Sequence, residues 1–427
     1  MSAAAYFRIH ALLLADALRG AVLVAPLAIL VGCACALFLW LLDAATNLRF
    51  AHPELLFGLP LAGALIAWLY ERYGGSAARG NNLIIDEIHE PGAGVPLRMA
   101  PLILATTVLT HLCGGSAGRE GTAIQMAGGL AGDYVRRIGF LIRPNDVSLI
   151  LTAGIAAGFA GVFGTPLAGA VFALEVLAVG RIRYDALGPC LVAAIIGDWS
   201  CAIWGGHHTH YHVASLVASG VDLRFDGVLL VKAALVGAAC GGVSVLFVTL
   251  THGIQDAFKR SIANPLLRPV VGGLLLIALA FALDARSYLG LGVTSPHPED
   301  VTIVSCFHPG GATLASWWWK LLFTALTLGA GFKGGEVTPL FFIGAALGNA
   351  GGSLLGGPID LFAAIGFVAV FAGATNTPLA CTIMAIELFG AEFAVHYAVA
   401  CIAAYTLSGH NGIYTSQRIC VGKSAVL

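Results

Sequence analysis

Long apolar stretches separated by short polar or glycine-rich segments dominate the chain. A membrane-spanning helix needs about 20 apolar residues, because the hydrocarbon core of a bilayer is about 30 Å thick. The stretches that meet this length in whole or in part are residues 21–42, 56–70, 101–112, 147–163, 187–204, 228–250, 270–283, 314–330, 361–374 and 394–407. Residues 118–132 and 334–348 are apolar pieces interrupted by glycine or proline, which is typical of broken helices. The pattern predicts an all-α integral membrane protein.

Composition supports this fold class. Of the 427 residues, 58% are hydrophobic and 11% are charged, against about 45–50% and about 25% in soluble domains. The 55 glycines lie within apolar runs, which favours closely packed membrane helices. A net charge of −1 argues against a nucleic-acid partner. The ten cysteines are scattered without a repeated CxxC spacing, so we interpret them as small buried hydrophobes.

The chain contains an internal repeat. Nine residues recur 212 positions later, namely Phe159, Ala160, Gly161, Thr165, Pro166, Leu167, Ala168, Ala173 and Glu175. Seven residues between positions 112 and 132 recur 216 positions later. The chain is therefore predicted to be one membrane domain over residues 1–427, with a first repeat at about 15–215, a second at about 225–420 and no soluble regulatory domain. Interrupted segments at corresponding positions of two halves point to a transport site where the halves meet.

The paired glycine-rich segments predict two helix N-termini. Residues 118–122 lead into an apolar helix whose first turn offers unpaired N–H groups, which attract an anion. Residues 334–339 are their counterpart, with Pro339 near the first helical position. The two N-termini are expected to face one site from opposite directions. The alternative is that these glycines only allow the helices to pack.

Glu120 and Glu336 are carboxylates in apolar surroundings. A charge at the centre of a membrane helix costs at least about 2.5–3.5 kcal/mol, so each needs a stabilising partner. A helix N-terminus can supply it, and the carboxylate then takes the place of an anion. A glutamate that leaves this place when protonated would couple anion and proton movement. The alternative, a permanent cap of its own helix, is favoured more for Glu336 than for Glu120. Arg119 is expected to anchor its turn through backbone carbonyls.

These segments resemble the motifs of the CLC superfamily of anion channels and anion/proton antiporters. Residues 118–122 resemble its GREGP motif, residues 331–339 its GxxGGxxxP motif, and residues 412–414 its pore tyrosine segment. The resemblance covers about residues 15–420. It implies an all-helical fold of two inverted repeats with broken, tilted and re-entrant helices, a homodimer, and one anion pathway in each subunit.

Departures from the family pattern resemble its fluoride branch, the CLC-F fluoride/proton antiporters. Residues 80–84 (GNNLI) lack the serine and proline of the chloride-coordinating GSGIP segment, and Thr122 replaces the proline of GREGP. Val176 takes the place of an internal proton-transfer glutamate. The resemblance implies proton-coupled fluoride export, by a multi-pass protein of the bacterial inner membrane that is not an enzyme. The alternatives are a chloride/proton antiporter or a passive chloride channel of the same fold.

The resemblance also assigns site residues. Glu120 matches the gating glutamate that exchanges protons. The residues implied to bind the anion are Asn81, Gly118, Arg119, Gly121, Thr122, Val337, Thr338, Phe342 and Tyr414. Such a set suits fluoride, because a small and strongly hydrated ion needs dense hydrogen-bond donors once it loses water. A phenyl ring can add its electropositive edge.

Two polar clusters fall outside this interpretation. They are His207, His208, His210 and His212 in one loop, and Asp86, Glu87, His89 and Glu90 after the asparagine pair. Imidazole and carboxylate groups are common metal ligands, so an intramembrane metalloenzyme is a remote alternative. Neither cluster forms HExxH, and we predict no metal and no cofactor. The role of the four histidines is left open at this point.

Overall fold

The computed structural model describes residues 3–209, 211–213 and 226–423, and almost all of its regular structure is helical. The helices are α1 (Ala3–Ala51), α2 (Leu59–Leu69), α3 (Asn81–His89), α4 (Met99–Leu112), α5 (Glu120–Ile138), α6 (Pro144–Phe163), α7 (Pro166–Glu175), α8 (Leu187–Ile203), α9 (Gly227–Ser261), α10 (Leu267–Ala282), α11 (Ser316–Gly329), α12 (Val337–Leu355), α13 (Ile359–Thr375), α14 (Pro378–Phe389) and α15 (Ala394–Leu407). Two short strands, β1 (Ala178–Val179) and β2 (Arg418–Ile419), pair in parallel. The predicted all-α class is confirmed. The predicted junction near residues 215–225 lies outside the described residues.

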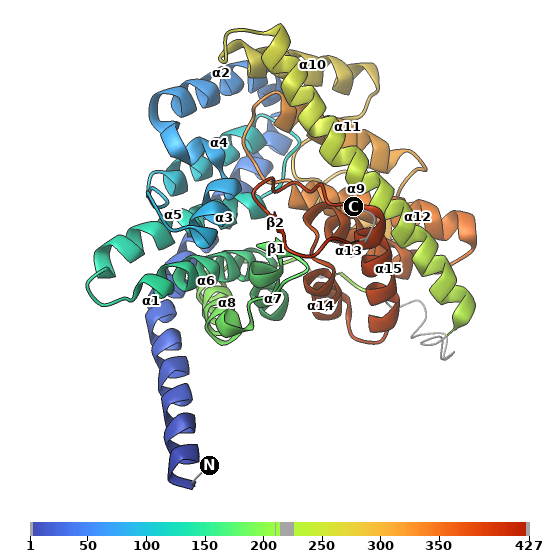
Figure 1. Cartoon of the computed structure of the whole chain (residues 1–427). Coiled ribbons are helices and arrows are strands. Elements are labelled where there is room, and N and C mark those ends of the chain that lie inside the picture. The colour runs from blue at the N-terminus through green and yellow to red at the C-terminus, as the bar shows by residue number, and fades with distance from the viewer. Residues whose placement is uncertain (1–2, 210, 214–225, 424–427) are drawn as a thin grey trace.

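Within the described residues, six helical segments are long and apolar enough to cross a membrane. They are Leu14–Ala51, Pro53–His89, Pro144–Phe163, Tyr184–Ile203, Gly227–Ser261 and Val337–Leu355. The other apolar helices are shorter, including α7, α13 and α14. The predicted stretch 21–42 is part of α1, whose N-terminal portion projects from the helical body (Figure 1).

Small residues bring helix backbones into direct contact. A Cβ atom added to Gly344 of α12 would lie 2.1 Å from the carbonyl oxygen of Gly366 in α13. A Cβ atom on Gly197 of α8 would lie 2.8 Å from the carbonyl oxygen of Ala157 in α6. Neither position has room for a side chain. Close packing of this kind is the expected use of glycine in membrane helices, where backbone contact replaces the hydrophobic effect.

Two helices at corresponding positions of the sequence repeat, α7 and α14, are joined by reciprocal hydrogen bonds. The carboxylate of Glu175, which ends α7, accepts hydrogen bonds from the N–H groups of Leu379 (3.1 Å) and Ala380 (2.8 Å) in the first turn of α14. Glu387 of α14 in turn accepts hydrogen bonds of 2.9 and 2.7 Å from the first turn of α7. Each carboxylate therefore satisfies the free N–H groups of the other repeat's helix.

Aromatic rings fill the core where the halves meet. Phe159 and its repeat counterpart Phe371 stack with centroids 6.4 Å apart, and Phe172 lies 4.5 Å from Phe159. Phe341 of α12 stacks on Phe367 of α13 at 4.0 Å. This aromatic core lies beside the site described next, because Phe341 and Phe367 also line its cavity.

Candidate functional site

The glycine-rich entries of α5 and α12 cross each other in the interior of the protein. Gly118 and Gly335 form an antiparallel bridge, in which each N–H donates to the other's carbonyl at 2.6 and 2.7 Å. A Cβ atom on Gly118 would lie 2.8 Å from Cδ of Pro339, so this position needs glycine. The bridge places the first residues of the two helices, Glu120 and Val337, next to each other. The paired motifs thus bring two helix N-termini to one place.

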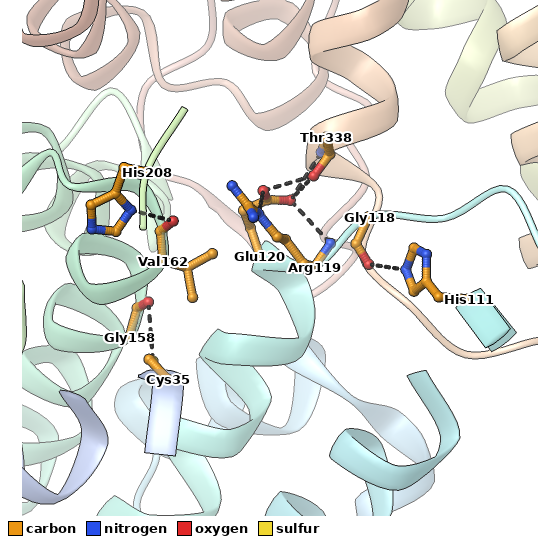
Figure 2. A network of polar contacts seen from close by, with 9 residues as sticks. All are labelled: Cys35, His111, Gly118, Arg119, Glu120, Gly158, Val162, His208 and Thr338. Carbon is orange, nitrogen blue, oxygen red and sulfur yellow. Dashed lines mark hydrogen bonds and ion pairs between the residues drawn. The ribbon is translucent and has the colours of Figure 1, made fainter. Parts of the chain in front are cut away.

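The carboxylate of Glu120 is bound to the N-terminus of the other repeat's helix. Its side chain is 1% exposed. Thr338 donates its backbone N–H to Oε2 at 3.0 Å and its hydroxyl to Oε1 at 2.7 Å (Figure 2). Arg119 donates its own N–H to Oε2 at 3.2 Å and its guanidinium Nε to Oε1 at 3.3 Å. The expectation that Arg119 anchors its turn on backbone carbonyls is therefore wrong, because its guanidinium pairs with Glu120.

This arrangement makes Glu120 a stand-in for an anion. The positive end of the α12 dipole, a backbone N–H and a hydroxyl are the donors that an anion would use. A negative carboxylate now occupies them. A free anion and the ionised carboxylate cannot use the same N–H and hydroxyl of Thr338 at once.

Glu120 lines a narrow cavity that borders a larger one. A narrow cavity of about 20 Å³ surrounds the carboxylate and is lined by aromatic side chains together with Arg119, Thr209 and Val293. The same three residues also line a larger polar cavity of about 190 Å³, which we call the vestibule. Asp43 and Arg49 of α1 stand among the vestibule's charged residues. The narrow cavity beside Glu120 and the vestibule are therefore neighbours that share part of their walls.

Asn81 lies on the other side of the first turn of α5. It opens α3 directly after Gly80, whose φ of +58° is a conformation that favours glycine. A Cβ atom on Gly121 would lie 3.4 Å from Asn81 Nδ2 and 3.3 Å from Glu336 Oε2, so these two groups share one small space. Asn81 is 9% exposed, yet its Oδ1 has no hydrogen-bond partner among the described residues. A buried polar atom without a hydrogen-bond partner in the protein needs a bound water or ligand.

The segment after α15 brings Tyr414 to the same region. Ile413 donates its N–H to the carbonyl of Ala374 at 2.9 Å, and Ser416 donates its N–H to Asn82 Oδ1 at 3.0 Å. Tyr414 is 5% exposed, and its hydroxyl has no hydrogen-bond partner in the described structure. It lies within electrostatic reach of both Glu336 and Glu120. Two unsatisfied polar groups, from Asn81 and Tyr414, thus lie close to the crossing of the two repeats.

Other residues that the resemblance assigned to the anion have different contacts. The hydroxyl of Thr122 hydrogen-bonds with that of Thr107 at 2.8 Å. The ring of Phe342 lies under the ammonium group of Lys320, 5.3 Å from its centroid. Its neighbour Phe341 lines the cavity beside Glu120, and sequence reasoning missed it. Neighbouring residues of a helix point about 100° apart. A motif match alone does not show which of two adjacent phenylalanines faces a cavity.

The contacts of Glu336 differ from those that the sequence predicts. It precedes the first residue of α12, but its side chain makes no capping bond to that helix. The prediction that it caps its own helix is therefore wrong. Its carboxylate lies beside Gly121 and within electrostatic reach of Lys333. The internal repeat pairs Glu336 with Glu120, but it did not show that the Glu336 side chain lies beside Gly121.

The two polar clusters have local partners. His207 and His208 line the vestibule, whereas His210 lies outside the described residues. In the acidic cluster, Asp86 pairs with Arg79 and Glu90 with Arg418. Among the residues that the structure describes, no group of three histidine, cysteine or acidic side chains could hold a metal ion.

Comparisons with known proteins agree on one family. The model of the voltage gated chloride channel family matches residues 62–409. A "Chloride/fluoride channel protein" of Pseudomonas syringae pv. tomato is 51% identical over 400 residues, covering 92% of this chain and 84% of that protein. The crystal structure of a CLC-type fluoride/proton antiporter matches with a TM-score of 0.86 at 34% identity, covering 94% of this chain and 98% of the other. A slow cyanobacterial Cl⁻/H⁺ antiporter has the same fold, with a TM-score of 0.74 at 19% identity over 91% of this chain and 94% of the other.

Proposed function

The chain belongs to the voltage-gated chloride channel (CLC) family, and we propose that it exports fluoride in exchange for protons, with Glu120 as the group that exchanges both. It is an integral membrane protein that transports ions, not an enzyme, and its bacterial relatives support the inner membrane as its location. The observation that carries the proposal is the bond between the Glu120 carboxylate and the N-terminus of α12.

Exchange follows from competition for the same donors. While Glu120 is ionised, it holds the N–H and hydroxyl of Thr338 and keeps an anion out. When a proton from the vestibule neutralises the carboxylate, the attraction to the helix dipole and to the guanidinium of Arg119 falls. The N–H group of Thr338 is then free to receive an anion. Release of the proton returns the carboxylate, which displaces the anion, so the two movements are coupled.

The donor set favours fluoride over chloride. Fluoride is small and strongly hydrated, so a pocket must replace its water with closely spaced donors. The amide of Asn81, the hydroxyls of Thr338 and Tyr414 and the N–H groups at the start of α12 supply them. The hydroxyl of Tyr414 has no partner in the described structure, which leaves it available to an ion. The relatives named for fluoride support this substrate, and chloride/proton exchange or passive chloride flow are the alternatives.

We further propose that the molecule is built from two inverted repeats within one membrane domain, at about residues 15–215 and 225–420. The reciprocal bonds of Glu175 and Glu387 to each other's helices support this division. The homodimer implied by the family resemblance stays a prediction.

Flux measurements on the reconstituted protein test the function. Purified protein in liposomes is given separate fluoride and chloride gradients, and anion efflux is recorded together with proton uptake. We expect fluoride efflux to drive proton uptake and chloride efflux to be much slower. Equal proton uptake with chloride would establish the chloride/proton alternative, and anion efflux without proton uptake would establish a passive channel.

A further inference from the structure

Tyr414 is held in place by its backbone and not by its hydroxyl. The ring is buried, and the hydroxyl has no hydrogen-bond partner in the described structure. Before the tyrosine, Ile413 donates its N–H to the carbonyl of Ala374 at 2.9 Å. After it, Gln417 donates its N–H to the carbonyl of Tyr414 at 3.2 Å, which closes a turn over residues 414–417. The direction of the hydroxyl therefore depends on what holds this turn.

The side chain of Gln417 fastens the turn to both halves of the chain. Its Nε2 donates to the carbonyl of Val176, directly after α7, at 3.0 Å. The same Nε2 donates to the carbonyl of Thr375, the last residue of α13, at 2.9 Å. Its Oε1 accepts a hydrogen bond of 2.8 Å from Nδ2 of Asn376. A side-chain amide has two N–H donors, and here both are used. Three hydrogen bonds of one side chain thus fix the turn against the ends of two helices from different halves.

Asn376 supplies one of these hydrogen bonds from a position where the backbone favours glycine. It follows α13 in a left-handed conformation, with a φ of +59°, which asparagine tolerates better than most residues do. Its counterpart 212 positions earlier is Gly164, which follows α6 with a φ of +70°. In place of that glycine, Asn376 offers an amide that binds Gln417 and accepts a hydrogen bond of 2.6 Å from Nζ of Lys423. The second half therefore carries an anchor that the first half lacks.

The same turn also contacts the residue next to Asn81. Ser416 donates its N–H to Oδ1 of Asn82 at 3.0 Å. Asn82 lies in the first turn of α3, directly after Asn81. The turn that begins at Tyr414 is therefore bound to the start of α3 as well as to the ends of α7 and α13. These contacts set where Tyr414 lies relative to Asn81.

We propose that Gln417 is a positioning residue that aims the hydroxyl of Tyr414 at the transported anion. This role rests on the proposed function, in which that hydroxyl is one of the fluoride donors. Gln417 keeps its own N–H groups on two carbonyls, so it acts through Tyr414 and not on the anion directly. Without Gln417 the hydroxyl is still present, but the turn no longer holds it in one direction. It then binds an anion more weakly, because its ordering has to take place on binding.

An infrared probe tests the positioning without any transport. p-Cyanophenylalanine takes the place of Tyr414, and the stretching band of its nitrile reports the surroundings of the outer end of the ring. We expect one narrow band in the protein that carries only the probe, and a shifted or broadened band in Gln417→Leu and in Asn376→Gly. Gln255→Leu, the same chemical change at an exposed position of α9, should leave the band as it was. An unchanged band in Gln417→Leu would overturn the proposal. Should that variant not fold, an unchanged band in Asn376→Gly would overturn it in the same way.

Fluoride efflux from liposomes provides the second readout, as a double-mutant cycle with Tyr414→Phe. Gln417→Leu should raise the fluoride concentration of half-maximal efflux by roughly tenfold, the effect of losing one hydrogen bond to an anion. In protein that already carries Tyr414→Phe, Gln417→Leu should raise it no further. A purely structural glutamine would act by the same factor with and without the hydroxyl, and that result would contradict the positioning role. If the nitrile band responds as expected but the unaltered protein moves no fluoride, the positioning of residue 414 stands and the proposed function fails.

Discussion

Glu120 and Glu336 occupy matching positions of the two repeats, 216 residues apart, yet their surroundings differ. Glu120 accepts hydrogen bonds from Thr338 and Arg119 and lies against the N-terminus of α12. Glu336 makes no capping bond to its own helix and lies beside Asn81 on the other side of Gly121. The crossing of Gly118 and Gly335 thus lies between a carboxylate held by the N-terminus of the partner helix and one that lies beside the amide of Asn81.

The difference teaches that a repeated motif does not dictate a repeated role. Both glutamates follow a glycine-rich turn, but only Glu120 meets a hydroxyl at hydrogen-bond distance from the partner helix. The counterpart of Thr338 near Glu336 is Thr122, 216 residues earlier, whose hydroxyl hydrogen-bonds with that of Thr107 instead. We therefore expect the largest functional effects on the Glu120 side and smaller ones on the Glu336 side.

Removing the titratable group of Glu120 should have the largest effect. Glu120→Gln keeps the size of the side chain but cannot carry and release a proton. We expect fluoride-driven proton uptake in liposomes to be lost. Glu87→Gln is a matched control, because Glu87 is also buried but only binds the N–H of Gly92. Undiminished proton uptake in Glu120→Gln would show that another group performs the exchange.

Thr338→Val should have the next largest effect. It removes a hydroxyl that donates to the ionised carboxylate of Glu120 and that is also one of the donors proposed for fluoride. Hydrogen bonds to charged groups contribute about 1.5–3 kcal/mol, so the rate of fluoride efflux under a fixed gradient should fall by roughly tenfold or more. Thr122→Val, whose hydroxyl binds Thr107 instead, should lower the rate less. An equal loss in both variants would show that the Thr338 hydroxyl has no special role.

Much of this site follows from the sequence, and the rest depends on contacts across the repeats. Helix N-termini, buried carboxylates and the internal repeat are local or periodic signals, and they predicted the fold and the position of Glu120 at a helix N-terminus. The hydrogen bond from Thr338 to Glu120 joins residues 218 positions apart. It exists only because the glycine-rich segments before α5 and α12 cross. The position of Phe341 beside Glu120, and the pairing of Thr122 with Thr107, depend on side-chain direction that spacing leaves undetermined.

Asn81→Ser tests the space on the Glu336 side. A shorter hydroxyl replaces an amide whose Nδ2, a hydrogen-bond donor, lies next to Gly121 and Glu336. Loss of one hydrogen bond to an anion should lower the ratio of fluoride to chloride transport by roughly tenfold, which corresponds to about 1.5 kcal/mol. The ratio comes from efflux under matched gradients of the two ions. An unchanged ratio would place selectivity on the Glu120 side alone.

Glu336→Gln should slow exchange while leaving its coupling intact. The substitution keeps an oxygen and an N–H donor beside Asn81, and Glu120 remains able to exchange protons. We expect fewer fluoride ions per second with the same number of protons per fluoride, measured in one liposome sample. If coupling is lost as it is in Glu120→Gln, both carboxylates exchange protons and the contrast between them disappears.

The smallest effect is expected where carboxylates are purely structural. Glu175 binds two N–H groups of α14, as Glu387 does for α7, and neither lies in the cavity around Glu120. In Glu175→Gln, the amide can accept with only one of its two terminal atoms, so one N–H of α14 is left without a partner and the attraction to the helix dipole is lost. We expect a loss of about 1–2 kcal/mol in stability, seen as a lower melting temperature in detergent, with coupling unchanged. Because Glu175→Gln and Glu120→Gln make the same chemical change at the N-terminus of a partner helix, loss of coupling in both would mean that such bonds transmit motion between the repeats.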